Sequence, residues 1–240
     1  MPEHQNIYDA NFVQDLFDSM AGTYGVVNLI SSFGFTYFWR RQCVRGIGQL
    51  PDASSGYDLM SGMGEIWGQF LKHYPGVGKL TAIDFSDSMI QGSLAQKDRM
   101  KTDRIEIIQA DALGESVAPD SADFIVCCFG LKTLSIAQRE IFAGRVAAAL
   151  RRGGRFSFLE ISKPEAWLLR VFFLFYLKLI IPIIGRVFLG DPANYRMLGI
   201  YTEHFGDCRA FGDQLKARGL TVAYRSFFFG CATGLTGSKS

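Results

Sequence analysis

The sequence lacks the features that mark several large classes of protein. Its formal net charge is only +2 over 240 residues, and it has no block of lysine and arginine that could follow a phosphate backbone, so we expect no nucleic-acid partner. Its three histidines and five cysteines lack the spacing of metal ligands, so we expect no metal site. Internal repeats and low-complexity tracts are also missing, which argues against a repeat architecture.

The cysteines do not form a disulfide framework. Their number is odd, and Cys127 and Cys128 are adjacent within an apolar run, so these two cannot easily pair with each other. This pattern is typical of free thiols in a reducing, cytoplasmic compartment. The first residues, MPEHQNIYDANF, are polar and acidic, unlike a secretory signal.

The residues that are present indicate one α/β domain over 1–240, with 48% hydrophobic residues to build its core. Apolar strand-like runs alternate with helical patterns, which predicts a doubly wound, mostly parallel sheet of seven strands. We expect a helical cap over 1–48 and a helix over 137–152 that ends at Gly153 and Gly154. The expected strands are 57–61, 79–84, 104–110, 122–130 and 155–162, followed by a hairpin of 221–229 and 231–237 around Gly230.

One segment is almost wholly apolar. AWLLRVFFLFYLKLII (166–181) lies in an expected lid insertion over 165–210, and only Arg170 and Lys178 interrupt it before Pro182, which we expect to end the helix. Its length as a helix is about 24 Å, shorter than a membrane span. It is either a buried lid helix whose two cations reach the surface, or a surface that meets lipid or a greasy substrate tail.

The stretch YDLMSGMGE (57–65) indicates a cofactor loop. Asp58 ends an apolar run, and Gly62 and Gly64 let the backbone turn tightly before a helix whose N-terminus can face a ligand. The third glycine of a dinucleotide fingerprint is missing. A glycine turn between a strand and a helix is common, so this loop is a weak signal when it stands alone.

Acids at the ends of the next two strands strengthen the prediction. Asp84 follows LTAI, where a carboxylate can accept hydrogen bonds from both ribose hydroxyls, and Asp111 follows IIQA, where one can accept from an adenine amino group. In a doubly wound sheet these strand ends meet at the edge where ligands bind. An adenosine without a diphosphate fits best, and S-adenosylmethionine is the obvious candidate.

At this point the sequence resembles the class I S-adenosylmethionine-dependent methyltransferases, and more closely the C-methyltransferases of ubiquinone and menaquinone biosynthesis. The resemblance covers nearly the whole chain and implies their Rossmann-like methyltransferase fold. The segments that carry it are VQDLFDSMAGTYG in the N-terminal helices, YDLMSGMGE, AIDFSDSM, QADAL, CCFGLKTLS, LRRGGRFSFLEISKP, IIPIIG and NYRML.

The resemblance implies a set of cofactor residues. Met63, Asp84, Asp111, Ala112 and Cys128 would hold S-adenosylmethionine, while Asp58, Gly62 and Gly64 would shape its loop. Met63 replaces a threonine of the family pattern. A thioether cannot donate the hydrogen bond of a hydroxyl, but it can pack against the methionine moiety, so we expect altered affinity.

The substrate side departs further from the family pattern, because FGLRN is FGLKT here. The resemblance gives Lys132 and Tyr24 as catalytic candidates, and it gives substrate contacts at Phe17, Met20, Asn28 and Thr133. Lys132 could orient a phenolate, act as a base if desolvated, or point to solvent. Tyr24 could bond the substrate or merely cover the cofactor. Among the histidines, His204 is the only one we consider as a base.

The expected activity is methyl transfer to a prenylated quinol or a related lipid-soluble phenol. Residues 166–188 would make peripheral contact with the inner face of the membrane, and a homodimer is one assembly open to the chain. Two alternatives remain. One is S-adenosylmethionine-dependent amination of ubiquinone to rhodoquinone, and the other is a non-catalytic cofactor-binding role in a quinone-synthesis assembly.

Overall fold

A seven-stranded sheet forms the centre of the computed structural model, which describes residues 6–32, 34–187 and 191–240, with the backbone alone at 21 and 23–31. The strand order is β3-β2-β1-β4-β5-β7-β6, and β7 runs antiparallel to β5 and β6 while the other pairs are parallel, as the sequence predicts. The strands are β1 (Ser55–Leu59), β2 (Lys79–Asp84), β3 (Ile105–Gln109), β4 (Ala122–Cys128), β5 (Leu150–Ile161), β6 (Leu220–Phe227) and β7 (Ala232–Lys239).

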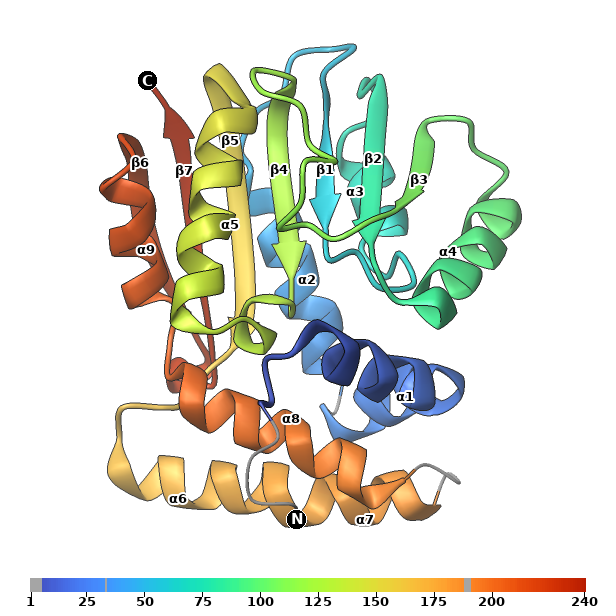
Figure 1. Cartoon of the computed structure of the whole chain (residues 1–240), viewed down its shortest axis with the longest axis vertical. Helices are drawn as coiled ribbons and strands as arrows, with labels where there is room; N and C mark the ends of the chain where they lie inside the picture. Colours follow the sequence, from blue (N-terminus) through green and yellow to red (C-terminus); the bar gives the residue numbers. More distant parts are fainter. Residues whose placement is uncertain (1–5, 33, 188–190) are drawn as a thin grey trace.

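Helices cover both faces of the sheet and its carboxyl edge (Figure 1). One face packs on α2 and α3 through a core that includes Trp67, Phe70 and Phe124, and the other packs on α5 and α9 through Phe142 and Phe211. Beyond the carboxyl ends of the parallel strands lie α1, α8 and the pair α6–α7. The helices are α1 (Ala10–Ser31), α2 (Phe35–Gly46), α3 (Trp67–His73), α4 (Asp87–Met100), α5 (Ile136–Ala149), α6 (Trp167–Phe175), α7 (Ile181–Val187), α8 (Pro192–Phe205) and α9 (Arg209–Lys216), with 3-10 turns η1 (Leu131–Thr133) and η3 (Phe228–Gly230).

The end of α5 differs from the prediction. The helix begins at a capping box of Ser135 and Gln138, but it stops at Ala149 instead of at the two glycines. Strand β5 starts at once, with Leu150 opposite Ala122, and the register then shifts so that Arg155 faces Phe124. Gly153 and Gly154 lie in this irregularity, and Gly153 has φ +79°. Glycine relieves the strain of a left-handed bulge position, so the glycine pair marks a bulge here and not a helix end.

The apolar segment forms one continuous helix from Trp167 to Val187, which is 21 residues and about 31 Å long. The expectation that Pro182 ends it was wrong. A π-helical turn, η2 (Tyr176–Ile180), precedes α7, and the Ile181 N–H bonds back to the Tyr176 carbonyl. Because the π turn shifts the hydrogen bonds to more distant carbonyls, the helix continues past Pro182 although proline has no backbone N–H to donate. By length and composition the helix is able to cross a membrane, and it is the one such helix in the described part of the chain.

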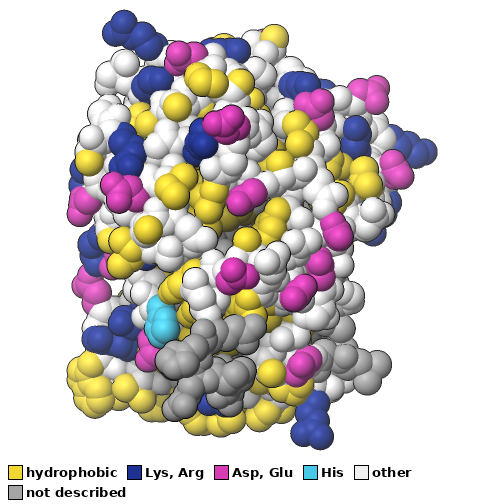
Figure 2. Space-filling model, in the orientation of Figure 1, with side chains coloured by type: hydrophobic (Ala, Val, Ile, Leu, Met, Phe, Trp, Pro, Cys, Tyr) yellow, Lys and Arg dark blue, Asp and Glu magenta, His cyan; other side chains and the backbone are white. Residues whose placement is uncertain are grey.

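Most of this helix is exposed. In the 18-residue window that is most apolar, only 22% of residues are buried, and α6 itself has no buried residue, so α6 is not the buried lid helix of the first interpretation. Leu177 and Ile181 on the opposite side are buried against α1 and α8. Lys178 pairs with Glu203 of α8, and Arg170 donates to the backbone of Glu165. Figure 2 shows hydrophobic side chains gathered along the lower rim of the molecule, where α6 and α7 lie.

Candidate active site

The loop after β1 is fixed by a buried carboxylate and an indole. Asp58 accepts a hydrogen bond from Trp67 Nε1 at 3.0 Å, and burial raises the pKa of this carboxyl well above its usual range. Gly62 and Gly64 both have positive φ, at 57° and 83°. A Cβ on Gly64 would come within 2.5 Å of the Trp67 ring, so only glycine fits there. Asp58 thus shapes the loop through Trp67.

Asp84, the last residue of β2, is tied to this loop. One carboxylate oxygen accepts from the Gly62 N–H at 2.8 Å, and the other accepts from the Ser86 N–H at 3.1 Å. Burial raises the pKa of Asp84, while these two backbone hydrogen bonds act in the opposite direction. Each carboxylate oxygen still has a lone pair for a ligand hydroxyl. Asp84 therefore presents acceptors to the neighbouring cavities.

Two small cavities, of about 50 and 40 Å³, lie along the carboxyl edge of the sheet and share Met60, Asp84, Phe85 and Thr133 in their walls. The hydroxyl of Ser61 in the first is buried and has no partner among the described residues. Carboxylates and an unpartnered hydroxyl suit the ribose and adenine of an adenosine cofactor. These residues fit S-adenosylmethionine, which in such sites supplies an electrophilic methyl group.

The structure brings half of the predicted site residues to these two cavities. Those in the walls are Phe17, Gly62, Asp84, Asp111, Ala112, Cys128 and Thr133. Gly64, Met63 and Met20 are not. The Met63 side chain packs on Gly92 of α4, and Met20 is buried in the cluster beneath α1 and α8. The side chains of Tyr24 and Asn28 lie outside the described residues.

We refer to a third cavity, of about 310 Å³, as the acceptor cavity, after the substrate that we propose for it below. Its walls come from α2, α6, η2, α7, α8 and η3, and they are almost wholly apolar. Lys132 is the one charged side chain among its described lining residues, which are Ser32, Phe35, Thr36, Trp39, Phe129, Lys132, Ile161, Phe173, Tyr176, Leu177, Ile181, Leu198, Thr202, Phe228 and Cys231.

Lys132 forms a buried ion pair with Glu160. The lysine is 5% exposed and Glu160 is fully buried, and Lys132 Nζ lies 2.6 Å from Glu160 Oε1. Glu160 also accepts the backbone N–H groups of Lys132 and Ile161, at 3.0 and 2.8 Å. The interpretation that Lys132 points to solvent was therefore wrong. Sequence reasoning missed Glu160, although it ends the apolar run RFSFL much as Asp84 ends its own strand.

Phe129 lines both the acceptor cavity and the cofactor cavity of about 50 Å³, so these two cavities adjoin at its side chain. Its backbone has φ +70°, an uncommon conformation for a bulky residue. The Arg40 guanidinium lies 5.2 Å from the ring centroid and Lys132 Nζ lies 5.8 Å from it. Arg40 is held in turn by Glu65 at 3.4 Å. Two cations thus clamp a strained aromatic wall, which the sequence pattern did not indicate.

Two other candidates are less suited to chemistry. A hydrogen bond with Cys43, together with burial, raises the pKa of the Cys128 thiol well above its usual range, so Cys128 lines the cofactor cavity as a neutral group. His204 is exposed in the last turn of α8 and lines none of the three cavities.

A parallel sheet whose strand ends hold carboxylates around a glycine loop, with an apolar cavity beside it, defines a class of protein, the S-adenosylmethionine-dependent methyltransferases of Rossmann-like fold. Residues 4–239 match the model of the ubiE/COQ5 methyltransferase family, and the chain belongs to that family. It is therefore a methyltransferase of quinone biosynthesis, and S-adenosylmethionine is its cofactor.

Relatives agree with this assignment, and solved structures share the fold. The chain is 28% identical to a ubiquinone/menaquinone biosynthesis C-methyltransferase of Idiomarina loihiensis over 87% of this chain and 82% of that one. It is 27% identical to a demethylmenaquinone methyltransferase of Lactiplantibacillus plantarum over 95% of each. The fold is shared with an S-adenosylmethionine-dependent methyltransferase of Thermotoga maritima, with a TM-score of 0.63 and 14% identity over 95% of this chain and 99% of that one. It is also shared with the [4+2]-cyclase SpnF, with a TM-score of 0.66 and 12% identity over 96% of each chain.

Proposed function

We propose that this chain transfers a methyl group from S-adenosylmethionine to a ring carbon of a prenylated quinol or a related lipid-soluble phenol. One observation carries the proposal. An apolar cavity of about 310 Å³ has one charged side chain, Lys132, among its described lining residues, and it adjoins the cofactor cavity of about 50 Å³ at Phe129. Such a cavity suits an aromatic ring with one oxygen to be held and an apolar tail to be enclosed.

The ion pair supplies the positioning. Nζ of Lys132 carries three N–H donors, of which Glu160 takes one, so donors remain for a phenolic oxygen of the acceptor. A cation beside that oxygen favours its ionised form, and an ionised oxygen makes the ring carbons nucleophilic. Glu160 keeps the cation in place at the wall of the cavity. The acceptor hydroxyl loses its proton to solvent before transfer, and the methylated ring carbon loses its own proton to solvent afterwards, which restores the aromatic ring. Lys132 acts as the orienting cation throughout.

The walls exclude water and set the distance of approach. Phe129 borders both compartments, and the cations of Arg40 and Lys132 lie 5.2 and 5.8 Å from its ring centroid. A fixed wall limits how the acceptor ring can face the cofactor, which is the condition for an in-line attack. The apolar lining keeps the phenolate away from bulk solvent, where its charge would be screened.

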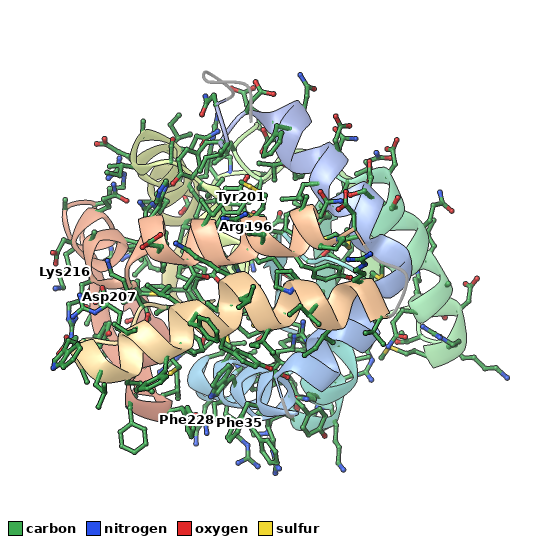
Figure 3. The ribbon with its side chains drawn as sticks, turned by 90° about the horizontal axis from the view of Figure 1, so that it is seen from below. Phe35, Arg196, Tyr201, Asp207, Lys216 and Phe228 are labelled. Carbon is green, nitrogen blue, oxygen red and sulfur yellow. The ribbon has the colours of Figure 1, made fainter. Side chains whose placement is uncertain are left out.

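The exposed hydrophobic side chains around the cavity define what we term the apolar surface. Its members are Phe35, Phe38, Trp167, Leu168, Val171, Phe172, Phe175, Leu179, Ile183, Val187, Phe228 and Phe229. The rings of Phe35 and Phe228 pack on each other with their centroids 4.8 Å apart (Figure 3), and both residues are exposed and line the acceptor cavity, so they form part of its rim at the protein surface. In this proposal the enzyme is cytoplasmic, and its apolar surface rests on the inner face of the membrane. A lipid-soluble acceptor then enters the acceptor cavity directly from the bilayer.

A second candidate function is amination of ubiquinone to rhodoquinone with S-adenosylmethionine as the source of the amino group. The observation that favours it is the changed substrate side, where Lys132 and Thr133 replace the arginine and asparagine of the family pattern and Lys132 is paired with Glu160. The fold also hosts other reactions, since SpnF is a cyclase. A non-catalytic role is less well supported, because the carboxylates and glycines of the cofactor loop are in place.

The test is mass spectrometry of the products formed by purified protein, methyl-labelled S-adenosylmethionine and a panel of reduced short-tail quinones. Label on a quinol supports methyl transfer and identifies the acceptor class. A quinone that changes mass without the label would move the assignment to amination. Cofactor binding without any product would point to the non-catalytic role. The Lys132→Met variant, which retains the cofactor residues, serves as the matched control for turnover.

A further inference from the structure

A basic cavity lies between the outer sides of α2 and α3. Its volume is about 220 Å³, and it shares no lining residue with the cofactor or acceptor cavities. Two consecutive turns of α2 contribute Arg41 and Arg45, and the last turn of α3 contributes Lys72 and His73. The remaining lining residues are Tyr37, Val44 and Gln69. None of the residues expected from the sequence to bind cofactor or acceptor lies here.

The charge of this basic cavity is not neutralised by the protein. Within the described ranges, no acidic residue lines it, and none of the ion pairs involves Arg41, Arg45 or Lys72. Arg40 on the same helix, by contrast, turns inward to Glu65. Arg45 and Lys72 lie in the last turns of their helices, where the negative ends of the helix dipoles offset part of the repulsion. Arginine forks and a lysine that converge in this way suit a phosphate.

The position of the basic cavity along α2 relates it to the apolar surface. Phe35 and Phe38 are exposed in the first turn of α2, while Arg41 and Arg45 follow one and two turns later. The rise of an α-helix places Arg45 about 10 Å along the axis from Phe38. Apolar groups of interfacial proteins enter a bilayer by about 5–10 Å beyond the headgroup boundary. The basic side chains therefore lie at the headgroup level when the aromatic ones reach the acyl chains.

We propose that the basic cavity binds the headgroup phosphate of an anionic phospholipid. The proposal rests on the membrane contact of the proposed function and extends it, because it adds a defined lipid site to a general apolar contact. A phosphate held between α2 and α3 fixes the tilt of the protein on the bilayer. That tilt keeps the rim of the acceptor cavity at Phe35 and Phe228 against the lipid, so the acceptor tail can stay in the bilayer during turnover.

The test compares vesicle binding by the wild-type protein and two triple variants that change the charge equally. The site variant is Arg41→Gln/Arg45→Gln/Lys72→Gln, and the control is Arg99→Gln/Lys101→Gln/Arg152→Gln, which are exposed cations outside the cavity. Sedimentation is measured with vesicles of phosphatidylcholine and with vesicles that also contain phosphatidylglycerol. Each cation near an anionic surface contributes about fivefold in binding, so the site variant should lose roughly 100-fold on the anionic vesicles. The control should lose less than fivefold.

Several outcomes would overturn the proposal. One is an equal loss of vesicle binding in both triple variants, and another is wild-type binding that does not increase with phosphatidylglycerol. A third is displacement of the protein from the vesicles by inorganic phosphate at the lipid concentration, which would make free phosphate the ligand. Methyl transfer to a short-tail quinol without vesicles separates this test from the proposed function. If the wild type transfers no label, and only the site variant loses binding to the anionic vesicles, the proposed function fails and the lipid site stands. If the site variant still transfers the methyl group to the short-tail quinol, its loss of vesicle binding arises at the membrane and not from a damaged active site.

Discussion

Asp84 is the residue on which cofactor binding most depends. Its carboxylate holds the glycine loop through the Gly62 N–H and presents acceptors to the cavities. We expect Asp84→Asn to weaken S-adenosylmethionine binding by roughly 1.5–3 kcal/mol, because charge-assisted bonds to ribose are lost. Calorimetric titration measures this change. An unchanged affinity would remove Asp84 from the site.

The pKa of Asp84 also predicts a pH dependence. Because burial raises this pKa above 3.8, the carboxyl takes up its proton at a higher pH than an ordinary aspartate does. Cofactor affinity should therefore fall on acidification before ordinary carboxylates titrate, and Asp84→Asn should remove that fall. The effect on stability has the opposite sign. The folded state binds the proton more tightly than the unfolded state, so this group favours folding more as the pH drops through the same window.

The Lys132–Glu160 pair couples stability to turnover. Lys132→Met leaves a buried carboxylate without its cation, which should lower the free energy of unfolding by about 3–5 kcal/mol. The double variant Lys132→Met/Glu160→Gln removes both charges and should recover a large part of that loss. Both variants should lose turnover by about 10²–10³-fold, since each lacks the donor to the acceptor oxygen. Urea melts and steady-state rates separate the two effects. Normal turnover in the double variant would make the pair purely structural.

At the scale of elements, the β6–β7 hairpin stores strain at its tip. Phe228, Phe229 and Gly230 all have positive φ, and Phe229 is 81% exposed. A left-handed conformation costs an L-residue about 1–2 kcal/mol, and little burial repays it here. The strained tip places Phe228 at the rim of the acceptor cavity and the exposed ring of Phe229 next to it. Backbone strain at an exposed aromatic residue is more consistent with a contact to a partner than with stability of the fold.

This strain gives a prediction in which stability and binding move in opposite directions. Phe229→Gly should raise the free energy of unfolding by about 1 kcal/mol, because glycine adopts the left-handed region without a Cβ clash. The same change should weaken vesicle binding, since an exposed ring of the apolar surface is lost. Ala53→Gly is the matched control. Ala53 also has a positive φ, of 59°, but lies outside the apolar surface, so stability should rise and vesicle binding should stay the same. Equal vesicle binding by both variants would exclude Phe229 from the membrane contact.

At the scale of the whole molecule, the sequence predicted what depends on local patterns. Strands such as β4 are buried on both faces and read as apolar runs, and Asp58 fixes the glycine loop through Trp67, which lies only 9 residues along the chain. The prediction failed where a distant partner decides the outcome. Lys132 appeared free to face solvent because Glu160 lies 28 residues away, on another strand.

Two further differences have the same origin. Gly153 was taken as a helix stop, but its place is set by the pairing of β5 with β4. Pro182 was taken as a helix end, but packing of α7 on α8 and α1 keeps the helix continuous through a π turn. Phe129 shows the limit most clearly, since its role as a wall arises from its position between Arg40 and Lys132 and not from its own motif.

The arrangement of the whole molecule predicts that the length of the acceptor tail decides how much the apolar surface matters. A short-tail quinol in solution can reach Lys132 without lipid, whereas a long-tail quinol is confined to the bilayer. Phe172→Asp adds a charge to the exposed face of α6, where Phe172 is 64% exposed, so folding should change by less than about 0.5 kcal/mol. Turnover of a long-tail quinol in vesicles should fall at least tenfold, because a charge entering the interface costs about 2 kcal/mol or more. Turnover of the short-tail quinol should be unchanged.

The matched control is Ile141→Asp on α5, where Ile141 is 50% exposed, and this change should affect the turnover of neither acceptor. If Phe172→Asp slows both acceptors equally, α6 acts on the chemistry through the cavity walls, and the apolar surface is not the route of entry.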